Sequence, residues 1–372
     1  MLAFALFASE RLMHRRLCLC LAVLLPLAGA SCDRGHPASE AVDQAGVAAA
    51  PQVPPPPNDT PAGQRIEADV RFLASDALAG RQVGTPGYEQ AAEYVARRYA
   101  DIGLLPAGDD GGYFQRVPLV QTIREREGAR LVVNRGGRTI ALRFLDQFIH
   151  DADPALPETA LEAPAVFVGQ AIHAPALGHD DFAGLDLRGK IAVMLPDAPA
   201  TFGNDLRAHY SSQQTKLEAV AARGAIGTLL VLTPDVLAGH PWDNKRANWV
   251  RPDMHLVDDD GSIVDGFPQL RAGAVVNAPA ADLLFADTGR TAAELFDAVK
   301  QGRAKGFDLP GTIAIAGRSR SRRLTSRNVI ARLPGSDATL AQEVIVNTAH
   351  LDHLGTGIGV DGDAIHNGAL DN

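Results

Sequence analysis

The chain has 372 residues, and its 35 Lys and Arg against 44 Asp and Glu give a formal net charge of −9. Hydrophobic residues make up 46% of the chain, which is enough to bury a core and excludes a wholly disordered protein. The acidic balance argues against a broad nucleic-acid surface, which needs a basic face, so we expect no nucleic-acid partner. At roughly 100–200 residues per domain, the length predicts two or three domains.

The first 31 residues have the pattern of an exported protein. A basic stretch at residues 14–16 precedes an apolar run at residues 17–30. This run is shorter than the roughly 20 residues that a bilayer-spanning helix needs. The order predicts a signal peptide over residues 1–31 and an exported protein, which would be periplasmic, membrane-anchored or secreted.

The three cysteines, Cys18, Cys20 and Cys32, all lie near the N-terminus, so no disulfide framework holds the fold. Leu27–Cys32 resembles a bacterial lipoprotein box, which would make Cys32 the site of a lipid anchor. Simple cleavage after Ala30 is the alternative. Residues 32–63 are rich in Pro and Ala and are expected to form a disordered tether.

Two packed helices are predicted over residues 65–104. Ile66, Val70 and Leu73 recur at helical spacing and predict the buried face of the first helix. Thr85 is a candidate N-cap for the second helix, with Pro86 at its first position and a glycine to end it at residue 103.

From about residue 120 the pattern changes to short β-strands. Asn134–Gly137 lies between two strand-like runs and predicts a hairpin, and Thr291 opens a helix with a capping box. Further predicted elements are strands at 165–168, 191–195 and 228–232 and a helix at 216–222.

Two near-continuous apolar runs, residues 328–333 and 344–349, follow these elements. Their composition is typical of buried strands of an α/β sheet. The simplest organisation is therefore an α/β domain that begins with the two helices, is interrupted by a β-rich insertion and resumes near residue 325.

Two further groups of residues leave alternatives open. Trp242 and Trp249 would either pack inside the insertion or line a partner surface. The arginines between Arg318 and Arg323 would form either a solvated linker or an anion site.

Candidate chemistry follows the second apolar run. His350 and Asp352 come directly after it, and Asp371 lies further along. Side chains two apart at the end of a strand point the same way, and ligand sites form beyond the carboxyl ends of strands. Imidazole and carboxylate together suit Zn²⁺, although a surface histidine at a capped strand end would show the same pattern.

Ala349–Gly355, together with Asp363–Asn372, resembles the motif of the di-zinc exopeptidases of metallopeptidase family 28. This family includes bacterial leucyl aminopeptidases and glutamate carboxypeptidase-like enzymes. Leu78–Arg81 and Gly84–Gly87 resemble the helical lead-in of the family. Residues 120–322 are similar to a protease-associated domain inserted at that point.

The resemblance implies a phosphorylase/hydrolase-like three-layer α/β/α zinc exopeptidase domain, interrupted by a β-rich protease-associated domain. On this interpretation residues 64–119 form the N-terminal helical part of the peptidase domain. Residues 323–372 then begin its catalytic part.

The resemblance also implies roles for individual residues. His350 matches a terminal ligand of one zinc, and Asp371 matches the carboxylate that bridges two Zn²⁺ ions. Asp352 matches an active-site acid that holds the His350 imidazole by its far nitrogen. His353 is expected to be structural, and His366 receives no role because many relatives have Tyr there.

The family also requires a Glu-Glu pair, one member of which is the general base, and a later Asp and His as ligands. All four would follow Asp371. We therefore expect the chain to be the N-terminal part of a longer enzyme, and to be inactive by itself.

The predicted function is that of an exported zinc aminopeptidase, which removes N-terminal residues from peptides with a water activated by two zinc ions. A non-catalytic, receptor-like protein of the same fold and a glutaminyl cyclase-like acyltransferase are the alternatives. Metal content would separate the receptor from the enzymes, and a glutaminyl-peptide substrate would separate the cyclase from the peptidase.

Overall fold

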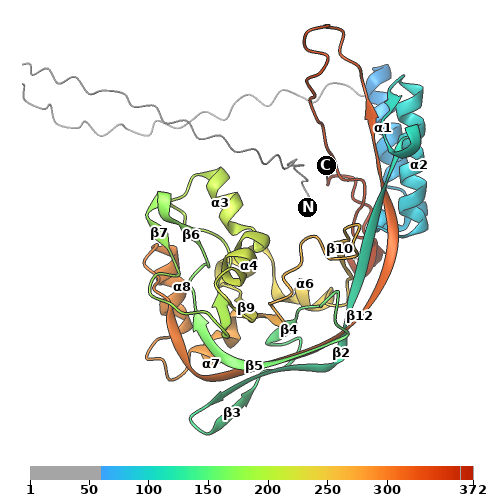
Figure 1. Cartoon of the computed structure of the whole chain (residues 1–372). Helices are drawn as coiled ribbons and strands as arrows, with labels where there is room; N and C mark the ends of the chain where they lie inside the picture. Colours follow the sequence, from blue (N-terminus) through green and yellow to red (C-terminus); the bar gives the residue numbers. More distant parts are fainter. Residues whose placement is uncertain (1–59, 361, 372) are drawn as a thin grey trace, which may run out of the picture. The chain divides into compact units, whose positions relative to one another are not determined.

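The computed structural model describes residues 60–360 and 362–371 (Figure 1). The chain divides into two compact units, one ending at Asp69 and one beginning at Val70. The predicted signal peptide, Cys32 and almost all of the predicted tether lie outside the described residues. Within the part that is described, no helix is long and apolar enough to cross a membrane.

The second predicted helix is confirmed as α2, Pro86–Asp101. The Thr85 hydroxyl accepts a hydrogen bond from the Tyr88 amide, and Pro86 occupies the first position because its missing N–H is not needed there. Gly103 follows the helix with a φ of +83°. The sequence features that start and stop this helix therefore act as predicted.

The first helix, α1, runs over Pro61–Leu73 and so begins within the stretch predicted as a tether. Its predicted apolar face is not buried, since Ile66 is 64% exposed and Val70 is 42% exposed. The helix ends at Leu73. A short 3-10 segment, Asp76–Arg81, follows it.

Among the described residues, nine strands form one mixed sheet, in the order β10-β2-β12-β5-β8-β9-β11-β4 with β3 paired to β2. Their bounds are β2 Phe114–Arg135, β3 Arg138–Ala141, β4 Phe148–His150, β5 Glu158–Phe167, β8 Ile191–Met194, β9 Gly227–Val231, β10 Asp253–Leu256, β11 Gly273–Val276 and β12 Phe307–Val329. The predicted hairpin is β2–β3, and the strands predicted near 165, 191 and 228 are β5, β8 and β9.

The helices of the β-rich part are α3 Asn204–Ser211, α4 Gln213–Ala221, α5 Pro234–Gly239, α6 Trp242–Ala247, α7 Ala281–Phe285 and α8 Ala292–Lys300. The capping box predicted at Thr291 opens α8. Short two-stranded pairs complete the described structure: β1 Leu105–Pro106 with β13 Ala331–Arg332, β6 His173–Ala174 with β7 His179–Asp180, and β14 Thr356–Val360 with β15 Asp363–Ile365.

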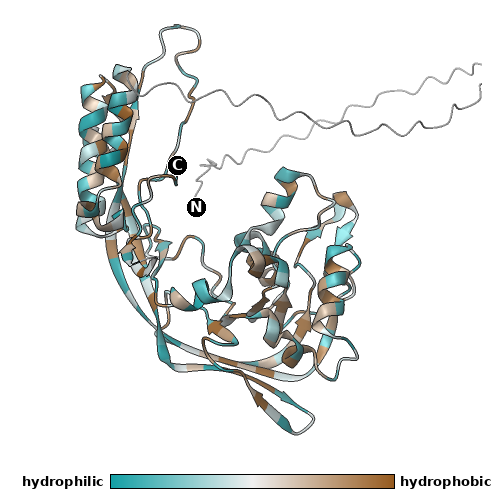
Figure 2. Cartoon of the chain, turned by 180° about the vertical axis from the view of Figure 1, so that it is seen from behind, coloured by the Kyte–Doolittle hydropathy of each residue, from teal (hydrophilic) through white to brown (hydrophobic). Residues whose placement is uncertain are grey.

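Helices cover both faces of the sheet at its centre. Alternate side chains of a strand point to opposite faces, so Val193 packs with α7 and α8, whereas Ala192 and Met194 pack with α4. Figure 2 shows the hydrophobic residues gathered in these strands and on the helices beside them. The two clusters form the core of the β-rich part.

The strands β5, β8, β9 and β11 are mutually parallel. Every other pairing in this sheet is antiparallel. The carboxyl ends of the four parallel strands therefore meet at one edge of the sheet, where α/β proteins commonly bind ligands.

The long strands β2 and β12 pair with each other over most of their length and form a curved ribbon (Figure 1). The arginines from Arg318 to Arg323 lie within β12, so the prediction of a linker there is wrong. The ribbon also runs across the boundaries expected at residues 119 and 322. Those domain boundaries, and the inserted protease-associated domain, stay predictions.

The predicted strand at residues 344–349 is wrong. Val344, Ile345 and Val346 form no strand and are 79%, 89% and 74% exposed. No other strand among the described residues pairs with this segment, and a lone apolar strand can neither bury its side chains nor pair its backbone groups. The other apolar run, 328–333, contributes only the end of β12 and the short β13.

Trp242 packs inside the β-rich part. Its side chain lies against Ile149 and Leu232, and its Nε1–H donates to the Leu145 carbonyl at 2.7 Å. The described structure is thus a mixed α/β fold, while the finer prediction of a three-layer zinc exopeptidase domain stays a prediction.

Candidate functional site

The segment that carries the predicted site residues is held by the 3-10 segment Asp76–Arg81. The Arg81 guanidinium donates to the Leu351 carbonyl at 3.1 Å and to the Asn367 carbonyl at 2.8 Å, and also to the Leu73 carbonyl. The Asn367 amide in turn donates to the Asp76 carboxylate at 2.8 Å. Arg81 is itself only 6% exposed, so this contact is a buried anchor for residues 351–367.

Gly80 lies in close contact with the same part of the chain. Its carbonyl accepts a hydrogen bond from the Gly355 amide at 3.0 Å, and its φ is +71°. A Cβ at this position would lie 2.4 Å from the Gly355 carbonyl oxygen and 2.7 Å from that of His366. The position therefore demands glycine both for its backbone conformation and for space.

The predicted site residues come from both ends of this anchored segment, His350 and Asp352 from its start and Asp371 from just beyond its end. His350 Nε2 lies 3.1 Å from Asp371 Oδ2. On the other side of the same ring, Nδ1 lies 2.7 Å from the Asp352 carbonyl oxygen and 3.4 Å from Asp352 Oδ1. The three side chains predicted for the site are therefore neighbours, although their assignment as ligands and active-site acid stays a prediction.

His353, expected to be structural, also reaches this group. Its Nδ1 lies 2.9 Å from Asp371 Oδ2, and its side chain is only 13% exposed. Sequence reasoning missed this contact because His353 follows Asp352 directly, where strand geometry would point it to the opposite side. The segment is not a strand, so that rule does not apply to it. His366, to which no role was assigned, lies 3.5 Å from the Arg251 guanidinium.

Two groups beside the site have shifted pKa values. Burial lowers the pKa of Arg81, and the negative charges of Asp371 and Asp352 oppose that shift. Burial also raises the pKa of Tyr88, whose hydroxyl donates to the Arg327 carbonyl at 2.6 Å, and the charge of Asp352 raises it further. Arg81 thus places a buried positive charge near the two carboxylates.

The pair of His350 and Asp371 fits part of a zinc site. Two ligands of one tetrahedral zinc, each at about 2.0–2.1 Å from the ion, lie about 3.3 Å apart. The separation of 3.1 Å between Nε2 and Oδ2 is close to this value. However, residues 60–360 and 362–371 contain no group of three or more His, Cys, Asp or Glu arranged to hold a metal ion.

No family model and no curated protein matches the chain. Similar solved structures include an aminopeptidase from Aneurinibacillus sp. strain AM-1, at 18% identity and a TM-score of 0.36. The alignment covers 74% of this chain and 49% of that one. Two structures of BSAP, a zinc aminopeptidase from Bacillus subtilis, are similar at 14% identity, with TM-scores of 0.28 and 0.29. These two alignments cover 74% and 73% of this chain, and 48% and 47% of the BSAP chain.

The chain thus spans about half the length of these aminopeptidase structures.

Proposed function

We propose that this chain contributes to an exported zinc aminopeptidase, an enzyme that hydrolyses the N-terminal residues of peptides. The observation that carries the proposal is the contact between His350 Nε2 and Asp371 Oδ2, with Asp352 at the opposite ring nitrogen. The order of residues around these positions, which resembles that of the di-zinc exopeptidases, supports the same proposal.

His350 and Asp371 would each provide a side-chain ligand to zinc. Bound zinc lowers the pKa of a water and polarises a carbonyl group. The described residues place no general base and no further ligand set beside this pair. The chain's own contribution is therefore the placement of two ligands.

Asp352 is a positioning residue in this proposal. The Asp352 carbonyl oxygen 2.7 Å from Nδ1 favours the tautomer that carries its proton on that nitrogen. His350 Nε2 then faces Asp371 Oδ2, 3.1 Å away, and these two atoms would be the zinc ligands. The Asp352 carboxylate lies 3.4 Å from Nδ1 and would be the outer partner that orients the ring. Loss of such a partner typically weakens metal binding by about 10–100-fold.

Zinc binding and peptide hydrolysis test the proposal. We expect the protein that contains this sequence to bind zinc and to cleave amino-acyl chromogenic amides. His350→Ala and Asp371→Asn should each abolish both properties, while His240→Ala, an exposed histidine outside this group, serves as the matched control. If the zinc-loaded protein left every chromogenic amide and short peptide uncut, the proposal would be wrong.

The proposed location follows from the N-terminal pattern. A protein exported with a lipid on Cys32 would be anchored to a membrane, with the residues between Cys32 and α1 as its tether. Cys32→Ser should move the protein from the membrane fraction to the soluble exported fraction, and Cys20→Ser should not. An unchanged distribution of the Cys32→Ser protein would favour simple cleavage after Ala30.

A further inference from the structure

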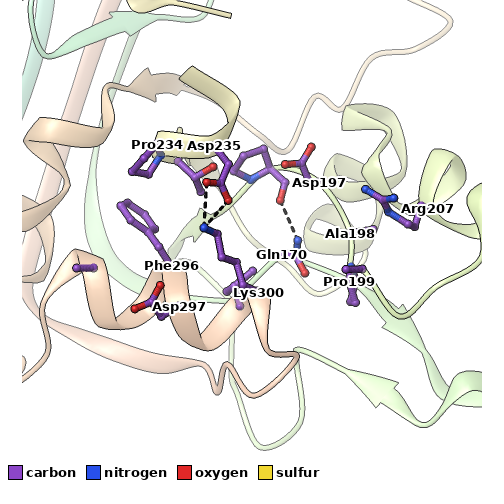
Figure 3. A pocket seen from close by; sticks show the side chains of 15 residues that line it. Gln170, Asp197, Ala198, Pro199, Arg207, Pro234, Asp235, Phe296, Asp297 and Lys300 are labelled. Atoms are coloured by element: carbon purple, nitrogen blue, oxygen red, sulfur yellow. Dashed lines mark hydrogen bonds and ion pairs between the residues drawn. The ribbon is translucent and has the colours of Figure 1, made fainter. Parts of the chain in front are cut away.

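A cavity of about 480 Å³ lies at the carboxyl edge of the parallel strands (Figure 3). Its walls come from the segments that follow three adjacent strands: Gln170 after β5, Pro196 and Asp197 after β8, and Pro234, the first residue of α5, after β9. Phe296 of α8 closes one side. This is the position at which open α/β sheets bind small ligands, and the volume is in the range of small-molecule sites.

The wall of the cavity is held by a buried lysine. Lys216 is 2% exposed, and its Nζ donates to the Asp197 carbonyl at 2.6 Å and to the Gln170 carbonyl. The Gln170 amide also donates to the Pro196 carbonyl at 3.1 Å. These bonds tie the loop after β5 to the loop after β8, so the cavity is preorganised.

Asp197 stands at the junction of these loops with a left-handed backbone. Its φ is +61°, an uncommon conformation for a residue other than glycine, and one that Asp and Asn adopt more readily than most. The side chain of Asp197 is exposed and lines the cavity. The carboxylate is therefore presented on a backbone that the buried lysine holds in place.

The side chains that line the cavity include one more carboxylate than cations, and the Lys216 ammonium lies behind the wall, bound to two backbone carbonyls. Three carboxylates line it, those of Asp197, Asp235 and Asp297, against the cations of Arg207 and Lys300. Lys300 is engaged by Asp235, with Nζ 2.7 Å from Oδ2 (Figure 3). The rest of the lining is mainly apolar, from proline, alanine, valine and Phe296.

We infer that this cavity binds a small primary amine that carries an apolar group, with the ammonium at the Asp197 carboxylate and the apolar part against Phe296 and Pro234. No residue of the His350 group lines the cavity. The inference therefore stands apart from the proposed function, and either can fail without the other.

Calorimetric titration of the full chain tests it. The probe is 2-phenylethylamine at neutral pH, where an alkyl amine is charged, and 2-phenylethanol is its neutral counterpart. Chelator is present, and the titration is repeated with His350→Ala, so that the His350 group cannot account for binding. We expect the amine to bind with a Kd on the order of 1 mM or tighter, and the alcohol to bind at least tenfold more weakly.

Variants locate the binding. Asp197→Asn keeps a residue that tolerates the left-handed backbone and removes the charge, so it should weaken amine binding about tenfold or more. Asp265→Asn, an exposed aspartate outside the cavity, should bind as the parent does. Arg207→Gln should leave amine binding unchanged or strengthen it, because it removes a competing cation. Failure of the amine to bind, equal binding of the alcohol, or full binding by Asp197→Asn would each overturn the inference.

Discussion

Lys216 shows how one buried charge can hold two loops together. Burial lowers its pKa from 10.5 to about 8, and the negative charges of Asp181 and Asp197 oppose that shift only in part. At neutral pH, burial of the ammonium therefore costs free energy, and two hydrogen bonds to backbone carbonyls offset this cost. This cost should be visible in the pH dependence of stability.

Between about pH 8 and pH 10.5 the unfolded lysine is protonated and the folded one is not. The unfolded state then binds more protons, so the contribution of Lys216 to the free energy of unfolding rises with pH, by up to about 3 kcal/mol. We expect the stability difference between the parent and Lys216→Met, from urea denaturation at pH 7.5 and pH 10, to grow in favour of the parent. Lys305→Met, at an exposed lysine, should show no such growth. Parallel pH profiles for the parent and Lys216→Met would contradict the argument.

At the scale of single residues, spacing predicted that His350 and Asp352 would point the same way, and the family resemblance added Asp371. The three side chains are neighbours. The contact of His353 with Asp371 was missed because residues 350–353 do not form the strand that was expected to lead into them. The anchor at Arg81 was not predictable from spacing, because it depends on how a segment near residue 80 meets residues 351–367, and no local pattern encodes a contact between segments so far apart in sequence. Lys216 was missed for the same reason, since a lysine is expected at the surface unless its acceptors are known.

At the scale of elements, caps and turn glycines were the most reliable signals. The Thr85 cap, the Thr291 capping box and the glycine turn of the β2–β3 hairpin all form as their sequences predict. Each depends only on residues a few positions apart. The prediction of a strand at 344–349 was wrong because an apolar segment forms a buried strand only where neighbouring strands pair with it, whatever its own composition.

A substitution at Gly80 should show whether the 3-10 segment holds residues 350–368 in place. Gly80→Ala adds a Cβ 2.4 Å from a backbone oxygen, so residues 350–368 should lose their docked position and become sensitive to limited proteolysis. Gly103→Ala is the matched control, because Gly103 also has a positive φ but has open space around it. That variant should lose about 1–2 kcal/mol without exposing residues 350–368. Equal protease sensitivity of the two variants would show that the close approach at Gly80 does not hold the segment.

At the scale of the whole molecule, the described residues differ greatly in how firmly they are held. The β-rich part has two large buried clusters, whereas the segment from residue 334 to 349 is exposed throughout. Residues 350–371 are attached mainly through hydrogen bonds to residues 74–81. Local stability should follow this difference, because regions with few buried apolar contacts open at low free energy.

Hydrogen exchange measured by mass spectrometry would test this difference in local stability. We expect amides of β8 and β9 to be protected to the limit of global unfolding, and amides of 350–368 to exchange orders of magnitude faster. A ligand stabilises only the state that binds it, so zinc held by His350 and Asp371 should slow exchange in 350–368 and leave β8 and β9 unchanged. In His350→Ala zinc should have no effect on either region. If zinc instead protected the β-rich part, or left 350–368 unchanged, the metal would bind elsewhere and the roles proposed for His350 and Asp371 would have to be abandoned.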